Sequence, residues 1–163
     1  MTLKFITTGG TIDKIYFDAN SRFEVGESQL SYILAEALVT FEYEIVSLMR
    51  KDSLEMTDAD RSQLRDFIAA DRAERFVVTH GTDTMAASAE ALVGIPGKTI
   101  VLTGALSPAR FRTTDATFNV GMAVAAAQTL DAGVYLAVSG RVFDAGRVRK
   151  NLEAQRFEEI IGE

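Results

Sequence analysis

The 163-residue sequence has no cysteine, one histidine and only two prolines. Without cysteine, structural disulfides, thiolate catalysis and cysteine-ligated zinc are excluded. A single histidine, His80, excludes a histidine-rich metal site and weakens any proposal of a Ser-His-Asp triad. The scarcity of proline argues against a proline-rich linker or a disordered tail.

An excess of positive charge and long apolar runs are also missing. The formal net charge is −6 and the isoelectric point is near 4.9, which argues against nucleic acid or an anionic membrane as a partner. No run approaches the ~18 apolar residues needed to cross a bilayer, and the first residues, MTLKFITTGG, lack the pattern of a secretion signal. With 47% hydrophobic residues to form a core, the sequence predicts a cytoplasmic, single-domain protein.

Short apolar runs alternate with longer amphipathic segments along the chain. The predicted strands span residues 3–7, 43–48, 76–79, 99–102 and 134–138, and the predicted helices span about 27–39, 57–71, 82–93 and 117–130. Thr57 and the acids after it are typical of a helix start, and residues 113–115 are expected to cap the fourth helix. This order predicts a three-layer α/β domain with a parallel, flavodoxin- or Rossmann-like sheet.

The segments that connect the predicted strands and helices include one long loop and several short polar stretches. Residues 12–26 show no clear periodicity and are expected to form a loop that acts as a lid, and the residues after 142 are expected to form a loop and a short terminal helix. Polar segments follow all five predicted strands, at the edge where ligands of such sheets bind. These segments are TTGGT, RKDSLEMT, HGTDTM, TGALSPARF and SGRVFDAGRVRK.

Two of these segments allow both a structural and a functional interpretation. In HGTDT, either Thr82 or Asp83 caps the next helix, or Asp83 binds an ammonium while Thr82 places a hydroxyl near the reacting group. In TGGTI, Gly9 and Gly10 allow a tight strand exit, or they bring Thr11 to a substrate. Neither segment contains the phosphate-binding patterns GxxxxGK[ST] or GxGxxG.

Lys150 lies in a polar segment, where most lysines are simply solvated. A lysine acts as a base only where burial and neighbouring cations favour its neutral form. Arg147 and Arg149 are nearby in the sequence, and Asp83 could orient the ammonium. His80 is expected to pack at the strand end or bond to the backbone rather than to act as a catalyst.

Together, four segments resemble the bacterial-type asparaginase family. TGGTI at 8–12 and HGTDTM at 80–85 match the two family signatures in order and spacing. DSLEMT at 52–57 resembles the substrate-binding segment between them, and DAGRVRK at 144–150 resembles the segment that bears the family lysine. The similarity covers nearly the whole chain and corresponds to the larger, N-terminal domain of that family.

The resemblance implies hydrolysis of the side-chain amide of L-asparagine. Thr11 would be the nucleophile that forms an acyl-enzyme and releases ammonia, and Thr82, Asp83 and Lys150 would activate the nucleophile or water. Backbone N–H groups around Thr82 would form the oxyanion hole. The residues assigned to substrate binding are Gly10, Ser53, Glu55, Gly81, Thr82 and Asp83. No metal or organic cofactor is implied, and assembly into a homo-oligomer is expected.

Two features depart from the family pattern. Phe23 aligns with a tyrosine of the lid, so Tyr16 is the candidate to supply that hydroxyl. The family's second domain is missing, which predicts either a short-form enzyme with a more open site or a protein that has lost activity. Two alternatives therefore remain, namely a non-catalytic module that binds or senses an amino acid, and an amidohydrolase that acts on glutamine or another amide.

Overall fold

A computed structural model describes residues 1–17 and 22–160, and its largest element is a six-stranded sheet in the spatial order β4-β1-β5-β6-β7-β8. All neighbouring strands are parallel except β7 and β8, which are antiparallel. The five predicted strands are thus parallel to one another, as expected, and β8, an antiparallel edge strand that was not predicted, makes the sheet mixed. The bounds of these strands are β1 Leu3–Gly9, β4 Tyr43–Lys51, β5 Arg75–Thr79, β6 Thr99–Thr103, β7 Gly133–Val138 and β8 Arg141–Asp144.

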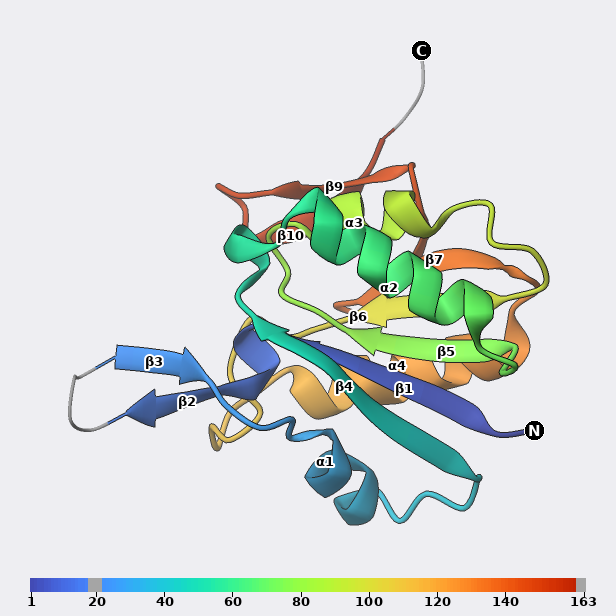
Figure 1. Ribbon diagram of the computed structural model, residues 1–163. Helices are drawn as coiled ribbons and strands as arrows, with labels where there is room; N and C mark the ends of the chain where they lie inside the picture. The colour runs from blue at the N-terminus through green and yellow to red at the C-terminus, as the bar shows by residue number, and fades with distance from the viewer. Residues whose placement is uncertain (18–21, 161–163) are drawn as a thin grey trace.

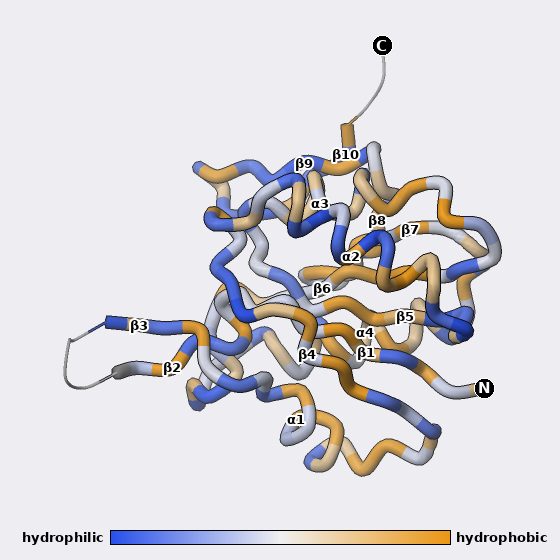
Figure 2. The backbone as a smooth tube through the Cα atoms, in the orientation of Figure 1, coloured by the Kyte–Doolittle hydropathy of each residue, from blue (hydrophilic) through white to orange (hydrophobic). Residues whose placement is uncertain are grey.

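Helices cover both faces of this sheet (Figure 1). The core on one face includes α2 and α3, and the core on the other includes α1 and α4. Apolar residues gather along the central strands of the sheet (Figure 2), as expected for strands buried on both faces. None of the helices in the described residues is long and apolar enough to cross a membrane. The helix bounds are α1 Leu30–Glu36, α2 Asp58–Ala70, α3 Met85–Leu92 and α4 Ala116–Thr129.

Adjacent residues of β5 show how the two cores are built. Phe76 packs with Leu64 of α2, whereas Val77 packs with Val120 of α4, because successive side chains of a strand point to opposite faces. All four of these side chains are essentially inaccessible to solvent. The predicted three-layer α/β fold is thus confirmed.

Two short hairpins lie outside the main sheet. Residues 12–26 were expected to be an irregular loop, but the described part of this segment, 12–17 and 22–26, contains most of a 3-10 turn, η1 (Thr11–Asp13), and an antiparallel pair, β2 (Lys14–Phe17) and β3 (Arg22–Val25). The terminal helix expected after residue 142 is also wrong, because β9 (Val148–Asn151) and β10 (Arg156–Glu159) pair antiparallel there. Their Val148 and Phe157 side chains join the core on the α2/α3 face, which holds this hairpin against the domain.

The helix starts follow the sequence only in part. Thr57 caps α2 in a reciprocal capping box with Asp60, as the pattern predicted. Neither Thr82 nor Asp83 caps the next helix, because α3 begins at Met85 and its N-cap is Thr84. The structural interpretation of HGTDT is therefore wrong, and both side chains are left for other contacts.

The start of α4 is also built differently from the expected cap. The Thr114 hydroxyl accepts a hydrogen bond from Ala116 N–H, but Asp115 makes no capping bond. Its carboxylate instead accepts bonds from Leu106 N–H and Ser107 N–H, and so fixes the loop after β6.

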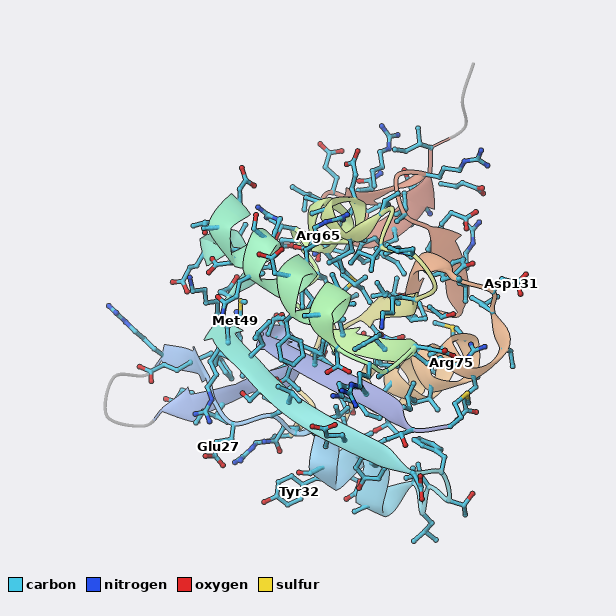
Figure 3. The ribbon with its side chains drawn as sticks, turned by 45° about the vertical axis from the view of Figure 1, so that its right-hand side comes forward. Glu27, Tyr32, Met49, Arg65, Arg75 and Asp131 are labelled. Atoms are coloured by element: carbon cyan, nitrogen blue, oxygen red, sulfur yellow. The ribbon has the colours of Figure 1, made fainter. Side chains whose placement is uncertain are left out.

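The two edges of the sheet differ in character. Figure 3 shows Arg75 and Asp131 at the edge where the parallel strands begin, and Met49 near the carboxyl end of β4. Arg75 Nη1 donates to the carbonyl oxygens of Ala127 and Leu130 at the end of α4. These bonds attach the end of α4 to the start of β5. The polar loops gather at the opposite edge.

Candidate active site

The candidate site lies where the strand order reverses, between β1 and β5. Among the parallel strands the order is second, first, third, fourth, fifth, and ligands of such sheets bind beyond the carboxyl ends of the strands at this switch point. Thr7 of β1 is in register with Thr79 of β5, and the Thr8 hydroxyl donates to the Thr79 carbonyl oxygen over 2.9 Å. The TGGTI and HGTDT segments therefore leave the sheet side by side.

The two loops touch through glycines. Gly10 has φ of +89°, a conformation that favours glycine, and a Cβ placed on it would lie 2.5 Å from the Cα of Gly81. A Cβ on Gly81 would in turn lie 2.5 Å from Cβ of Ser53. Three segments of the chain therefore meet with no room for another methyl group. Thr11 and Thr82 follow directly after the two touching glycines.

The third group, Lys150, comes from β9. Lys150 lies on the same face of the strand as buried Val148 and opposite Phe157 of β10, so its side chain is only 6% exposed. Its Nζ donates to Thr82 Oγ1 over 2.7 Å and to Asp83 Oδ1 over 2.5 Å. The structure thus brings Lys150 to Thr82 and Asp83, which precede it by 68 and 67 positions in the sequence.

Arg149 does not share the surroundings of Lys150. Its side chain is 70% exposed and lies 3.7 Å from a carboxylate oxygen of Glu158. Neighbouring residues of a strand face opposite ways, so Arg149 points away from the side on which Lys150 meets Asp83. The Lys150 ammonium is held by a carboxylate and a hydroxyl.

The DSLEMT segment is fixed to both neighbouring loops. It forms a 3-10 turn, η3 (Ser53–Glu55), which Asp52 caps by accepting from Leu54 N–H. The second oxygen of Asp52 lies 2.7 Å from Lys14 Nζ at the base of the first hairpin. Burial alone would raise the pKa of Asp52, but Lys14 and the backbone donors lower it below its ordinary value. On the other side, the Thr84 hydroxyl donates to the Ser53 carbonyl oxygen over 2.7 Å.

Ser53 and Glu55 have different surroundings although they belong to the same turn. Ser53 is buried against Gly81, whereas Glu55 is exposed and lines a groove of about 450 Å³ between the first hairpin and η3. The other lining residues are Lys14, Phe23, Glu24, Val25, Arg50, Asp52 and Leu54.

The candidate lid residues lie on the projecting hairpin (Figure 1). Tyr16 of β2 is in register with Phe23 of β3, and their rings meet edge to face at 5.6 Å. Phe23 also contacts Phe111 of the loop before α4, with ring centroids 5.8 Å apart. Tyr16 is 54% exposed, so about half of this residue lies at the surface.

Asp13 is a buried carboxyl group that the sequence analysis missed. Its backbone oxygen accepts from Gly26 N–H over 2.8 Å and its Oδ1 accepts from Gln29 N–H over 2.9 Å, so one residue ties both ends of the hairpin together. Burial raises the pKa of Asp13 to about 6, despite the opposing hydrogen bonds. The signal in the sequence was an acid placed directly after the apolar end of TGGTI.

Asn119 was missed as well. From α4 its Nδ2 donates to the Gly104 carbonyl oxygen, and its Oδ1 accepts from Ser139 N–H. A single buried amide thereby joins the loops that follow β6 and β7. An asparagine inside an apolar helical pattern was the available signal, because buried polar groups need partners.

His80 packs at the end of β5, as expected. Its ring is inaccessible to solvent, and Nδ1 lies 2.7 Å from the Gly81 carbonyl oxygen. Burial, with a smaller contribution from Arg61, lowers the pKa of His80 to about 4 against the opposing effect of the Gly81 bond. The ring is therefore neutral near pH 7. Among the described residues no group of three acidic or histidine side chains could hold a metal ion.

Comparison with known proteins identifies the family. A family model described as Asparaginase, N-terminal, matches residues 2–159. The chain belongs to the asparaginase family. Comparison with curated proteins gives no match.

Two solved asparaginase structures show the same fold. One is the thermostable L-asparaginase from Thermococcus kodakarensis, with a TM-score of 0.80 and 25% identity over 98% of this chain. Another is L-asparaginase I from Vibrio cholerae O1 biovar eltor str. N16961, with a TM-score of 0.82 and 28% identity over 97% of this chain. In each case the match covers 51% of the other protein, so this chain spans about half the length of these asparaginases.

Proposed function

We propose that this protein hydrolyses the side-chain amide of L-asparagine to L-aspartate and ammonia. The observation that carries the proposal is the contact of the buried Lys150 ammonium with Thr82 and Asp83, at the switch point of the sheet. Similarity to solved L-asparaginases supports the choice of substrate.

In the first step, Thr11 Oγ1 attacks the amide carbon. The hydroxyl proton passes to the amide nitrogen, the C–N bond breaks, and ammonia leaves an aspartyl ester on Thr11. A threonine hydroxyl needs a nearby acceptor for its proton, and the chain offers no cysteine and only a buried histidine for that role. The hydroxyl of Thr82 suits the transfer because it accepts from Lys150 and keeps its own O–H free to donate.

In the second step, a water molecule attacks the ester carbon. Thr82 Oγ1 takes the proton of the water and passes its own hydrogen to Thr11 Oγ1, while the ester bond breaks and aspartate leaves. Asp83 holds the Lys150 ammonium in place through one carboxylate oxygen. Positioning of this kind accounts for several kcal/mol of barrier reduction in enzymes, roughly 7 kcal/mol or more in the best cases.

The substrate's charged groups need partners of opposite charge. Only Oδ1 of Asp83 contacts Lys150, and the Asp83 side chain is 36% exposed, so its second oxygen is available for the substrate ammonium. Glu55 is the second candidate carboxylate for the ammonium, and buried Ser53 beside Gly81 is the candidate for the substrate carboxylate. The proposal places the reaction in the cytoplasm and in a homo-oligomer, as the family resemblance implies.

Ammonia release from asparagine by the wild type and by Thr11→Ala tests the proposal. The wild type is expected to release ammonia from asparagine far faster than from glutamine, without added metal, and Thr11→Ala to be inactive with an unchanged Tm. A wild type no faster than the alanine variant would contradict the proposal. If asparagine then still bound in calorimetry, the amino-acid-binding alternative would replace it, and a preference for glutamine would change the substrate.

A further inference from the structure

We propose that Lys51 is a positioning residue, which holds the loop of Thr11 at a fixed distance from the η3 turn (Ser53–Glu55). It does so through two attachments, one by its backbone and one by its ammonium group. The inference rests on the proposed function where it concerns the substrate, whereas the two attachments are independent of that function.

The backbone of Lys51 is bound to the loop of Thr11. Its carbonyl oxygen accepts a hydrogen bond from Gly10 N–H over 2.9 Å, and Gly10 directly precedes Thr11. The approach is close, because a Cβ placed on Gly9 would lie 2.6 Å from the same carbonyl oxygen and 2.7 Å from Lys51 N. The end of β4 therefore determines where the chain leaves β1.

A change of register between β1 and β4 brings Lys51 to this place. Thr7 is paired with Ser47. The next pair is Gly9 with Lys51, so β4 uses two more residues than β1 over this part of the ladder. With the regular register, Met49 would lie opposite Gly9. Irregularities of this kind redirect side chains and occur often beside active sites. Here the irregularity places Lys51 at the exit of β1.

The ammonium group of Lys51 is bound to the start of α2. Its Nζ donates to Asp60 Oδ1 over 2.8 Å and to Asp60 Oδ2 over 2.9 Å. Asp60 Oδ2 also accepts from the N–H and the hydroxyl group of Thr57, the last residue of the DSLEMT segment. Lys51 directly precedes that segment, so one carboxylate group joins both of its ends. The bonds from Lys51 and Thr57 lower the pKa of Asp60 to about 2, which keeps it ionised at neutral pH.

The two attachments bear on the reaction because they meet in one residue. The DSLEMT segment, closed by Asp60, carries Ser53 and Glu55, the candidates for the charged groups of the substrate. The bond from Gly10 holds the loop of the candidate nucleophile. A displacement of ~1 Å between a nucleophile and a bound carbonyl carbon can lower the rate by about 10²-fold. Lys51 acts through the two segments that it joins, without contact with the substrate.

A gain in overall stability does not account for this ion pair. The Lys51 side chain is 39% exposed, and accessible ion pairs contribute little to the stability of a fold. Lys4 offers a comparison, because its Nζ lies 2.5 Å from Asp71 Oδ2 with side chains that are only 13% and 16% exposed. That more buried pair lies at the start of β1, at the edge opposite to the polar loops. Lys4 is therefore the matched control.

Hydrogen exchange tests the attachments without any substrate. Lys51→Met removes the ammonium group, whereas Lys51→Arg keeps the charge and can bond to both oxygens of Asp60. Exchange of the Gly10 amide, relative to the amides of β5, is expected to be roughly tenfold faster in Lys51→Met than in the wild type, because the opening is local. It is expected to be unchanged in Lys51→Arg and in Lys4→Met. Wild-type exchange at Gly10 in Lys51→Met would overturn the inference.

Kinetics with asparagine test the consequence for the reaction. Lys51→Met is expected to raise KM and to lower kcat, each by about tenfold, because both the turn and the nucleophile loop are displaced. Lys51→Arg is expected to recover most of both values, and Lys4→Met to keep wild-type kinetics even though it lowers Tm more. Equal kinetics of Lys51→Met and Lys4→Met, or no recovery in Lys51→Arg, would show that the pair serves only the fold and would overturn the inference.

The outcomes separate the inference from the proposed function. A wild type that releases no ammonia would end the proposed function, while exchange at Gly10 would still decide whether the ammonium group of Lys51 fixes that loop. An active wild type together with wild-type kinetics in Lys51→Met would leave the proposed function in place and contradict the positioning role.

Discussion

Lys150 Nζ lies 2.7 Å from Thr82 Oγ1, although the two residues come from opposite ends of the second half of the chain. The contact joins the hairpin of β9 and β10 to the loop after β5. It also buries the ammonium almost completely, with 6% of the side chain exposed. The chemistry proposed for this protein depends on that contact.

Lys150→Met is expected to lower kcat by about 10² to 10⁴, because the donor that holds the Thr82 hydroxyl in place for proton transfer in both steps is lost. Arg149→Met is the matched control, since Arg149 is the neighbouring residue but lies on the exposed face of β9. Steady-state ammonia release measures both, and circular dichroism checks the fold. Equal activities of the two variants would remove Lys150 from the mechanism.

Gly81→Ala is expected to lower both stability and activity. The added methyl group would lie 2.5 Å from Cβ of Ser53, and overpacking of this kind typically destabilises by ~1–3 kcal/mol. Gly121→Ala in α4 is the control, because a Cβ there meets nothing within 4 Å and replaces glycine inside a helix. It is expected to stabilise by roughly 0.5–1 kcal/mol. Urea unfolding measures the free energy of unfolding of both variants. A change of the same sign in the two variants would contradict the prediction.

Asp13→Asn is expected to stabilise the protein above pH 6. The pKa of Asp13 is raised from 3.8 to about 6, so the folded protein keeps a proton that the unfolded chain has already lost in this range. Stability from this group therefore falls as pH rises from about 4 to 6 and stays low above it. Asparagine cannot ionise, and its oxygen can still accept from Gln29 N–H.

The advantage of Asp13→Asn should grow from near zero at pH 4 to about 3 kcal/mol at pH 7. His80 acts in the opposite direction, because its pKa of about 4 makes stability rise with pH up to about 6.5. Its contribution is present in both proteins and cancels in their difference. Urea unfolding at several pH values measures the difference, with the exposed Asp66→Asn as the control. A pH-independent difference would contradict the assignment.

Lys14→Met is expected to raise KM several-fold with a smaller effect on kcat. The substitution breaks the 2.7 Å ion pair with Asp52 and so detaches the first hairpin from the turn that carries Ser53. Arg22→Met, on the exposed part of the same hairpin, is the control. Kinetics with asparagine decide between them, and an unchanged KM in Lys14→Met would show that the hairpin and the turn act separately.

The central sheet could be predicted from the sequence because its strands are buried on both faces. Runs such as Phe76–Val78 contain only apolar residues, and such runs between amphipathic helices have few alternative interpretations. The two hairpins could not be predicted in this way. Val148 and Phe157 are the buried apolar residues of β9 and β10, and their neighbours in each strand are charged or polar. One apolar residue per strand is too short a pattern to predict a strand from the sequence.

The candidate site, like the fold, could be predicted from the sequence only in part. The segments that converge were evident from their positions after the strands, and the contact of Lys150 with Thr82 and Asp83 agrees with the grouping that the resemblance implied. The roles of Asp13 and Asn119 depend on hydrogen bonds to backbone atoms of other loops. Such bonds have no fixed spacing in a sequence, so single-residue patterns do not predict them.

The attachment of Lys150 to a small hairpin has a consequence for the lifetime of the candidate site. The hairpin is held mainly by Val148, Phe157 and the bonds of Lys150 itself, whereas the six-stranded sheet has its own two cores. Partial opening of the hairpin, a sub-global event with a smaller free energy than complete unfolding, would withdraw the amine while the sheet stays intact. Heat inactivation should therefore precede the melting of the domain and reverse on cooling.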